Sequence, residues 1–145
     1  MRLSKILGMQ AFSRDGKVSG YVLSAVRCDD TLLGFICCDE REREFFAEGG
    51  DLIIHEDKLY FKETGKTPKT GKNVRLGYPV YSHLGKFLGH AEDFIVKGAK
   101  IVHMTVGNKK YAFGNLKISD AVIVDDGRTS AEIKAKDLLI DAMLS

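Results

Sequence analysis

Apolar and polar residues alternate in short runs along this chain of 145 residues, and glycines separate many of the runs. In the segment KIVHMTV (100–106), Val102, Met104 and Val106 alternate with Ile101, His103 and Thr105, which predicts a strand with the first three side chains facing a core. Many short strands with turn residues between them are typical of small barrels and sandwiches. The pattern therefore predicts an all-β fold.

One phrase occurs twice, as LGMQAFSRDGKVSGY (7–21) and LGYPVYSHLGKFLGH (76–90). Leucine, serine, lysine and three glycines recur at a constant offset of 69 positions, and Phe12 matches Tyr81. Each phrase reads as a strand, a glycine-containing turn and a second strand, so the glycines are predicted to serve backbone geometry. The predicted structural glycines are Gly8, Gly16, Gly20, Gly77, Gly85 and Gly89.

The same offset extends the match into the third strand of each copy. The segment TLLGFICC (31–38) is apolar on both faces, so its periodicity alone does not say which face is buried. Its alignment with 100–106 predicts that Leu33, Phe35 and Cys37 face the core and that Cys38 points outward.

An offset this long with only two copies predicts two tandem small barrels instead of a solenoid. Segments 51–54 and 120–123 align as the closing strands, each beginning with aspartate. A barrel this small is marginal alone, so we expect the two to pack together or the chain to form a homodimer. The predicted units are repeat 1 (1–61), a basic flexible linker (62–73), repeat 2 (74–127) and a C-terminal α-helix (128–145).

The C-terminal helix is predicted from a capping box and an apolar stripe. Thr129 and Glu132 have the spacing of a capping box, and Ile133, Ile140 and Leu144 follow at helical spacing. We expect this helix to cover an open edge or end of a barrel, with a dimer contact as the alternative.

The repeated phrase G-x-x-[apolar]-[aromatic]-S-x-x-G-K-x-x-G, followed by an apolar strand pair and a D-x-[apolar]-[apolar] segment, resembles the PRC-barrel family. The resemblance covers 1–61 and 74–127. Family members include the H subunit of photosynthetic reaction centres, the ribosome-maturation protein RimM and stand-alone proteins. The sequence shows neither the membrane helix of the H subunit nor the extra domain of RimM-like proteins. The resemblance therefore implies a stand-alone tandem barrel that binds other macromolecules.

Charge, apolar run length and cysteine content limit the partners and the cellular compartment that we expect for this protein. The formal net charge is only +2, and the basic excess is confined to 62–75, where the chain has five lysines and arginines and one glutamate. No run approaches the roughly 20 apolar residues that cross a bilayer, so we expect no membrane insertion. Three cysteines without framework spacing favour a cytoplasmic protein.

The sequence contains no recognisable catalytic motif, so we expect a protein that is not an enzyme and has no cofactor. Cys37 and Cys38 are adjacent in a strand and should point to opposite faces, which argues against a shared metal or redox site. His83, His90 and His103 have no histidine at the matching positions of the first copy. A redox or small-ligand protein using these groups is the weaker alternative.

The sequence thus predicts a non-catalytic adaptor that binds an unidentified protein partner. A strip of alternating charge could contact that partner through Glu40, Arg41, Glu42 and Arg43. The alternative is an RNA- or ribosome-associated assembly factor, because basic side chains cluster in and beside the linker near aromatic residues. These basic side chains are Lys62, Lys66, Lys69, Lys72 and Arg75.

Overall fold

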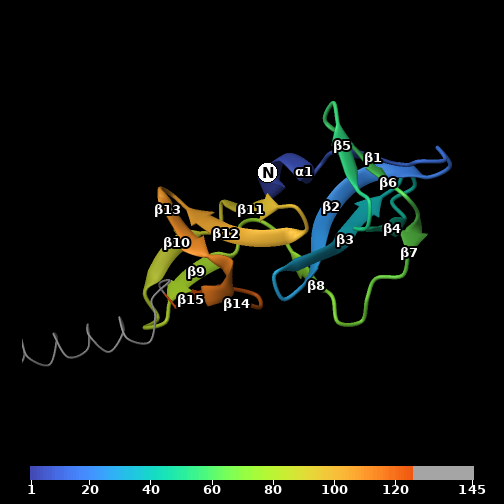
Figure 1. The fold of residues 1–145 in the computed structure, drawn as a ribbon. Helices are drawn as coiled ribbons and strands as arrows, with labels where there is room; N and C mark the ends of the chain where they lie inside the picture. The colour runs from blue at the N-terminus through green and yellow to red at the C-terminus, as the bar shows by residue number, and fades with distance from the viewer. Residues whose placement is uncertain (126–145) are drawn as a thin grey trace, which may run out of the picture.

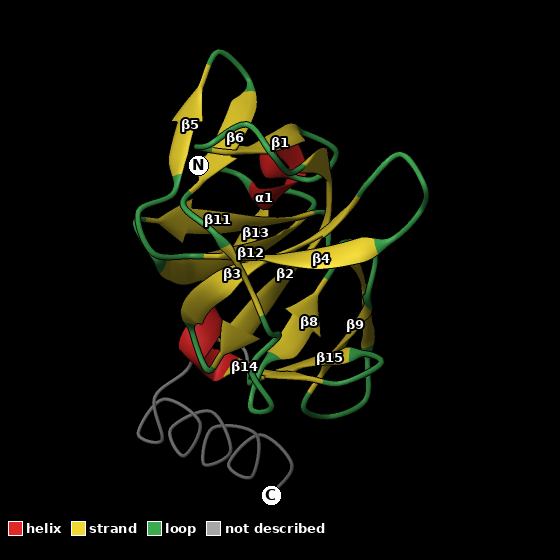
Figure 2. Ribbon diagram, turned by 90° about the vertical axis from the view of Figure 1, so that its right-hand side faces the viewer, coloured by secondary structure: helices red, strands yellow, loops and turns green. Residues whose placement is uncertain are grey.

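The computed structural model describes residues 1–125, and the predicted C-terminal helix lies outside them. The described chain is built of strands arranged in two sheets, with one short helix, α1 (Leu3–Ile6), and one 3-10 turn, η1 (Phe113–Asn115) (Figure 1). The prediction of an all-β fold is confirmed. Figure 2 shows how strongly the larger sheet is curled.

The first half of the chain is a set of strands paired mainly in sequence order. β2 pairs antiparallel with β1 and β3, β3 pairs with β4, and β6 pairs antiparallel with β5 and parallel with β1. The strands are β1 (Gln10–Ser13), β2 (Ser19–Cys28), β3 (Thr31–Cys38), β4 (Glu44–Glu48), β5 (Ile53–His55) and β6 (Lys58–Phe61).

The second half has the same order of pairings. β9 pairs antiparallel with β10, β12 with β11 and β13, and β15 pairs antiparallel with β14 and parallel with β9. β10 and β11 together correspond to the single long strand β2. The strands are β9 (Pro79–Ser82), β10 (Phe87–His90), β11 (Asp93–Lys97), β12 (Lys100–Val106), β13 (Lys109–Ala112), β14 (Leu116–Ile118) and β15 (Val122–Val124).

The pairing register corrects the alignment of the closing strands. β15 pairs parallel with β9 as β6 does with β1, so the counterpart of 122–124 is β6 and not the segment 51–54. The offset changes because the turn between β3 and β4 is longer than the two-residue turn between β12 and β13. A single ungapped offset therefore fails after the third strand.

The two halves meet where β3 touches β12, and the contact has two-fold character. The amide of Leu32 donates to the carbonyl of Ala99 at 2.8 Å, and the amide of Ile101 donates to the carbonyl of Asp30 at 2.8 Å. The two donors, Leu32 and Ile101, are 69 positions apart in the sequence, and so are the two acceptors, Asp30 and Ala99. Each bond is therefore the counterpart of the other. The halves thus contact each other through equivalent residues.

Each half also pairs with a short segment that, in the sequence, comes just before the strands of the other half. The segment predicted as a flexible linker (62–73) contains β7 (Thr64–Gly65), which pairs with β4, and all but the last residue of β8 (Lys72–Val74), which pairs with β2. In return, Arg2 forms an antiparallel bridge with Ile95 of β11. Because β8 leads into the second half but pairs with the first, the connection is part of the sheet.

The N-terminal segment is fixed to the second half by Asp93. The amide of Ser4 donates to the Asp93 carboxylate at 2.9 Å, and the Ser4 hydroxyl donates to the other oxygen of the same group. Leu3 and Ile6 on the buried side of α1 are 0% and 3% exposed. The short helix therefore closes the junction between the halves.

One continuous core runs through both halves. Its fully buried side chains include Leu3, Leu59, Phe61, Val74, Val80, Phe94, Ile101, Met104, Val122 and Val124. The prediction for the third strands was correct for Phe35, Cys37, Met104 and Val106, which are buried. It was wrong for Leu33 and Val102, which are half-buried, because each is the extra residue of a β-bulge: Arg27 pairs with Leu32 after Val26 has paired with Gly34, and Val96 pairs with Ile101 after Ile95 has paired with His103. The bulge at Val102 turns Ile101, which was predicted to face outward, into the core, where it is 1% exposed.

Candidate protein-binding surfaces

The repeated serine and glycine residues build the tips of two hairpins. Gly16 and Gly85 have φ of 76° and 86°, in the region that favours glycine. The hydroxyl of Ser13 accepts a hydrogen bond from the amide of Val18 at 2.9 Å, and Ser82 accepts one from Lys86 at 3.1 Å. These residues hold backbone turns and do not converge on a reactive centre.

The remaining recurring glycines allow tight backbone geometry. Gly8 and Gly77, which precede the first strand of each copy, have φ of 87° and 89°. A Cβ atom at Gly20 would lie 2.3 Å from the carbonyl oxygen of Cys38, and Gly89 lies at a register shift in the β9–β10 pair. The repeated phrase is therefore structural in both halves.

Apolar side chains line the outer surface of the first half, across β2, β1, β6 and β5. Phe12 pairs with Tyr60, which pairs with Ile53, so these three side chains form one row. The rings of Phe12 and Tyr60 stack at 5.9 Å, while Ile53 at the end of this row is 51% exposed. Tyr21 of β2, which pairs with Gln10 of β1, is 49% exposed. We call Tyr21, Phe12, Tyr60 and Ile53 the first end face. Lys58 lies over the Phe12 ring at 5.9 Å.

The second half has a corresponding row across β10, β9 and β15. Phe87 pairs with Tyr81, which pairs with Ile123, and the two rings lie 5.6 Å apart. Phe87 and Ile123 are 51% and 46% exposed, and Leu84 at the hairpin tip is 81% exposed. We call Tyr81, Phe87, Ile123 and Leu84 the second end face. The His90 ring packs against Phe87 at 5.4 Å.

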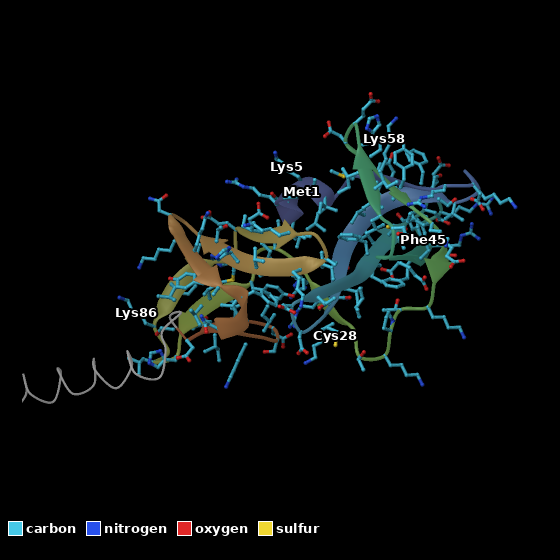
Figure 3. All side chains as sticks on the ribbon, viewed as in Figure 1. Met1, Lys5, Cys28, Phe45, Lys58 and Lys86 are labelled. Atoms are coloured by element: carbon cyan, nitrogen blue, oxygen red, sulfur yellow. The ribbon has the colours of Figure 1, made fainter. Side chains whose placement is uncertain are left out.

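The two end faces lie at opposite ends of the molecule. β5 and β6 are at one end in Figure 1, and β9, β10 and β15 are at the other. Figure 3 marks the two ends with Lys58 and Lys86, which are adjacent to the first and second end face. Exposed aromatic and apolar groups of this kind are enriched at protein interfaces. The arrangement suits contact with two partners at once.

The basic side chains proposed for RNA contact are all exposed, but aromatic platforms beside them are few. Tyr60, Phe61 and Tyr78 flank the basic segment; Phe61 and Tyr78 are 0% and 5% exposed, and Arg75 stacks on the Tyr78 ring at 5.3 Å. Tyr60 is half-buried, and its ring stacks on that of Phe12. Base stacking needs an open ring face, and here the ring of Tyr78 packs into the protein. The exposed basic residues are Lys62, Lys66, Lys69, Lys72 and Arg75.

The strip of alternating charge forms the turn between β3 and β4. Asp39 accepts hydrogen bonds from the amides of Arg41 and Arg43, both at 2.9 Å, and from the Arg43 Nε at 3.0 Å. The Arg43 and Arg41 amides lower the pKa of the Asp39 carboxyl. Glu40, Arg41, Glu42 and Arg43 are all exposed, but the carboxylate that organises them bonds within the turn. Asp39 thus shapes the turn, and the partner contact predicted for the four exposed residues stays a prediction.

The cysteine and histidine side chains do not assemble a site. Cys37 is fully buried, and this burial raises the pKa of its thiol to about 12, whereas Cys28 and Cys38 are half-buried. Within residues 1–125, histidine, cysteine and acidic side chains form no group of three that could hold a metal ion. Among the same residues, no helix is long and apolar enough to cross a membrane.

Sequence reasoning missed the end faces, because their members come from strands that only the fold brings together. One signal was present, since Phe12 and Tyr81 match in the repeat and occupy the outer surface in both halves. The chain matches no protein-family model, and comparison with curated proteins found no match.

Proposed function

We propose that the protein is a non-catalytic adaptor that binds protein partners through its two end faces. The observation that carries the proposal is the exposure of Ile53 and Phe87, each 51%, within aromatic rows at opposite ends of the molecule. Partly exposed aromatic and aliphatic side chains on a rigid sheet lose little conformational entropy on binding. Two such surfaces facing away from each other would let one chain bridge two proteins.

We also infer that the chain is a duplicated, tandem PRC-type barrel. This inference is supported by the repeated phrase and by the recurrence of the strand pairings, including the parallel closing pairs β1·β6 and β9·β15. The family resemblance favours a binding role over catalysis, because the repeated residues serve turns and core packing. A fold alone assigns no partner, so the end faces must carry the functional argument.

A protein partner is favoured over RNA by the position of the aromatic rings. Two of the three rings that flank the basic segment, those of Phe61 and Tyr78, are buried, and the third, that of Tyr60, stacks on Phe12 within the first end face. RNA binding through the exposed lysines remains the alternative, and it predicts an affinity that falls steeply as salt concentration rises.

The test is affinity purification from the native cell, with and without nuclease, using the wild-type chain and the variants Ile53→Lys and Ile123→Lys. Each variant puts a charge within one end face, so each should lose a different set of nuclease-resistant protein partners. Ala112→Lys adds the same charge at an exposed position outside both faces and should lose none. Partner sets unchanged by both isoleucine variants would contradict the proposal, and loss of all partners on nuclease treatment would favour RNA.

A further inference from the structure

A cavity of about 620 Å³ opens at the junction of the two halves, and Leu52 and Ile54, on either side of Ile53 in the sequence, help to line it. Its apolar wall is formed by Ile6, Leu32, Phe35, Leu52, Ile54 and Val96. Asp51 and Lys97 also line it, as does Met1, which lies between the two halves in Figure 3. This volume is within the range of roughly 300–1,000 Å³ that is usual for ligand sites.

The strand register identifies the counterpart of this cavity in the second half. Phe35 pairs with Ala47 of β4, and Met104, the counterpart of Phe35, pairs with Tyr111 of β13. Continuing that register by two residues places Gly49, which lines the cavity, at the position of Phe113. The residues that follow agree, because Gly-Asp-Leu comes after Gly49 and Gly-Asn-Leu comes after Phe113.

In the second half, this space is filled by an aromatic ring. Phe113 is only 7% exposed, and its ring packs against the Phe94 ring at 6.1 Å and under the Arg27 guanidinium at 5.4 Å. The offset of 69 positions gives Ala25 and Val96 as the counterparts of Phe94 and Arg27.

Three large side chains on one side of the junction thus correspond to smaller ones on the other. Gly49 stands at the position of Phe113. Ala25 and Val96 stand at the positions of Phe94 and Arg27, which pack on the Phe113 ring. The cavity is the space that remains where the second half holds a packed ring. An apolar wall of this extent favours an apolar occupant, since a cavity of about 150 Å³ is enough to bind benzene.

We propose that the cavity binds an aromatic side chain of a protein partner, in the place that Phe113 fills in the other half. Buried aromatic anchors supply much of the binding energy of protein interfaces. The chain's own residues 126–145 include no phenylalanine, tyrosine or tryptophan, so they cannot supply the ring. The choice of a protein partner rests on the proposed function, whereas the preference for an aromatic ring rests on the cavity alone.

Because the protein contains no tryptophan, a tryptophan probe can be followed by its own fluorescence. Titrating the full chain into N-acetyltryptophanamide should give a saturable blue shift, with half-saturation on the order of 0.1–1 mM. N-acetylphenylalaninamide should displace the probe, and N-acetylglycinamide should not. A shift that does not saturate, or displacement by both compounds, would overturn the proposal.

Two measurements locate the binding. Ala99 is an exposed residue lining the cavity, and Ala99→Phe should weaken probe binding at least about tenfold by occupying it. Ala112→Phe places the same ring at an exposed position outside the cavity and should leave binding unchanged. Methyl NMR of the unaltered protein should show ligand-dependent shifts at Leu32, Ile54 and Val96. Shifts confined to other methyl groups would refute the site even if a variant fails to fold.

The source of the ring is tested with a short peptide carrying one central phenylalanine between alanines. A peptide that binds at least as tightly as N-acetylphenylalaninamide supports a partner's side chain, because flanking backbone is then tolerated. Exclusion of the peptide with retention of the free amide would overturn the assignment to a protein partner. These titrations need no cellular partner, so their failure is distinguishable from failure of the end-face experiment.

Discussion

Gly20 and the carbonyl of Cys38 lie so close together that no side chain fits between β2 and β3 at this point. A Cβ atom at position 20 would lie 2.3 Å from that oxygen and 2.9 Å from the Phe45 ring. Gly20→Ala must therefore shift backbone, and we expect it to lower the free energy of unfolding by about 1–3 kcal/mol.

Urea unfolding of the variant and the wild type measures this loss. Gly50→Ala is the matched control, because no atom lies within 4 Å of a Cβ at that position. We expect the control to keep or slightly raise stability by restricting the unfolded chain. Equal stability of the two variants would contradict the close packing at Gly20.

Burial sets the chemistry of the Cys37 thiol. Desolvation raises its pKa from the ordinary 9.0 to about 12, so the folded protein retains the proton where the unfolded chain loses it. Stability should therefore be unaffected by this group below pH 9 and should fall between pH 9 and about 12, by roughly 1.4 kcal/mol per pH unit.

Thiol labelling under native conditions near pH 8 gives a direct readout of this burial. Cys28 and Cys38 are half-buried and should react, whereas Cys37 should react only after unfolding. A Cys37→Ala variant should retain the alkaline stability that the wild type loses. Rapid native labelling of Cys37 would contradict the buried position.

At the level of elements, β8 turns the connection into part of the larger sheet. Lys72–Val74 pairs with β2, and the Val74 side chain is 0% exposed. We expect the amides of β8 that bond to β2 to exchange hydrogen much more slowly than the amides of the exposed residues 66, 67, 69 and 70. Exchange in β8 is slow because it requires opening of the sheet.

Native-state hydrogen exchange followed by NMR tests this difference. The amides of β6 provide an internal reference for a strand that belongs to the first half alone. Exchange in β8 as fast as in the exposed stretch would mean that the connection moves freely, as the sequence suggested.

The sequence predicted most strands because their apolar residues alternate and glycines mark their turns. It did not predict β7 and β8, because this basic stretch has no apolar periodicity and Val74 is its single fully buried residue. It also misplaced the last strand pair, because nothing in the pattern fixes the length of the turn between β3 and β4. The end faces could not be predicted, since Phe12, Tyr60 and Ile53 become neighbours only through strand pairing.

At the scale of the whole molecule, both proposed sites depend on the two halves forming one body. The end faces point apart only if the junction is rigid, and the cavity exists only where α1, β3 and the segment 49–54 of the first half meet β11 of the second. The exchanged segments, the shared core and the β3–β12 hydrogen bonds all connect the halves. We therefore expect them to unfold together, as small cooperative domains do.

The most direct test is urea unfolding of the full chain, followed by NMR at amides in each half. Ala11 and Leu59 report on the first half, and Val80 and Val122 report on the second, all four being fully buried. We predict one midpoint and one slope for all four signals. Two separate midpoints would show that the halves are independent, which would contradict a rigid adaptor with a binding cavity at its junction.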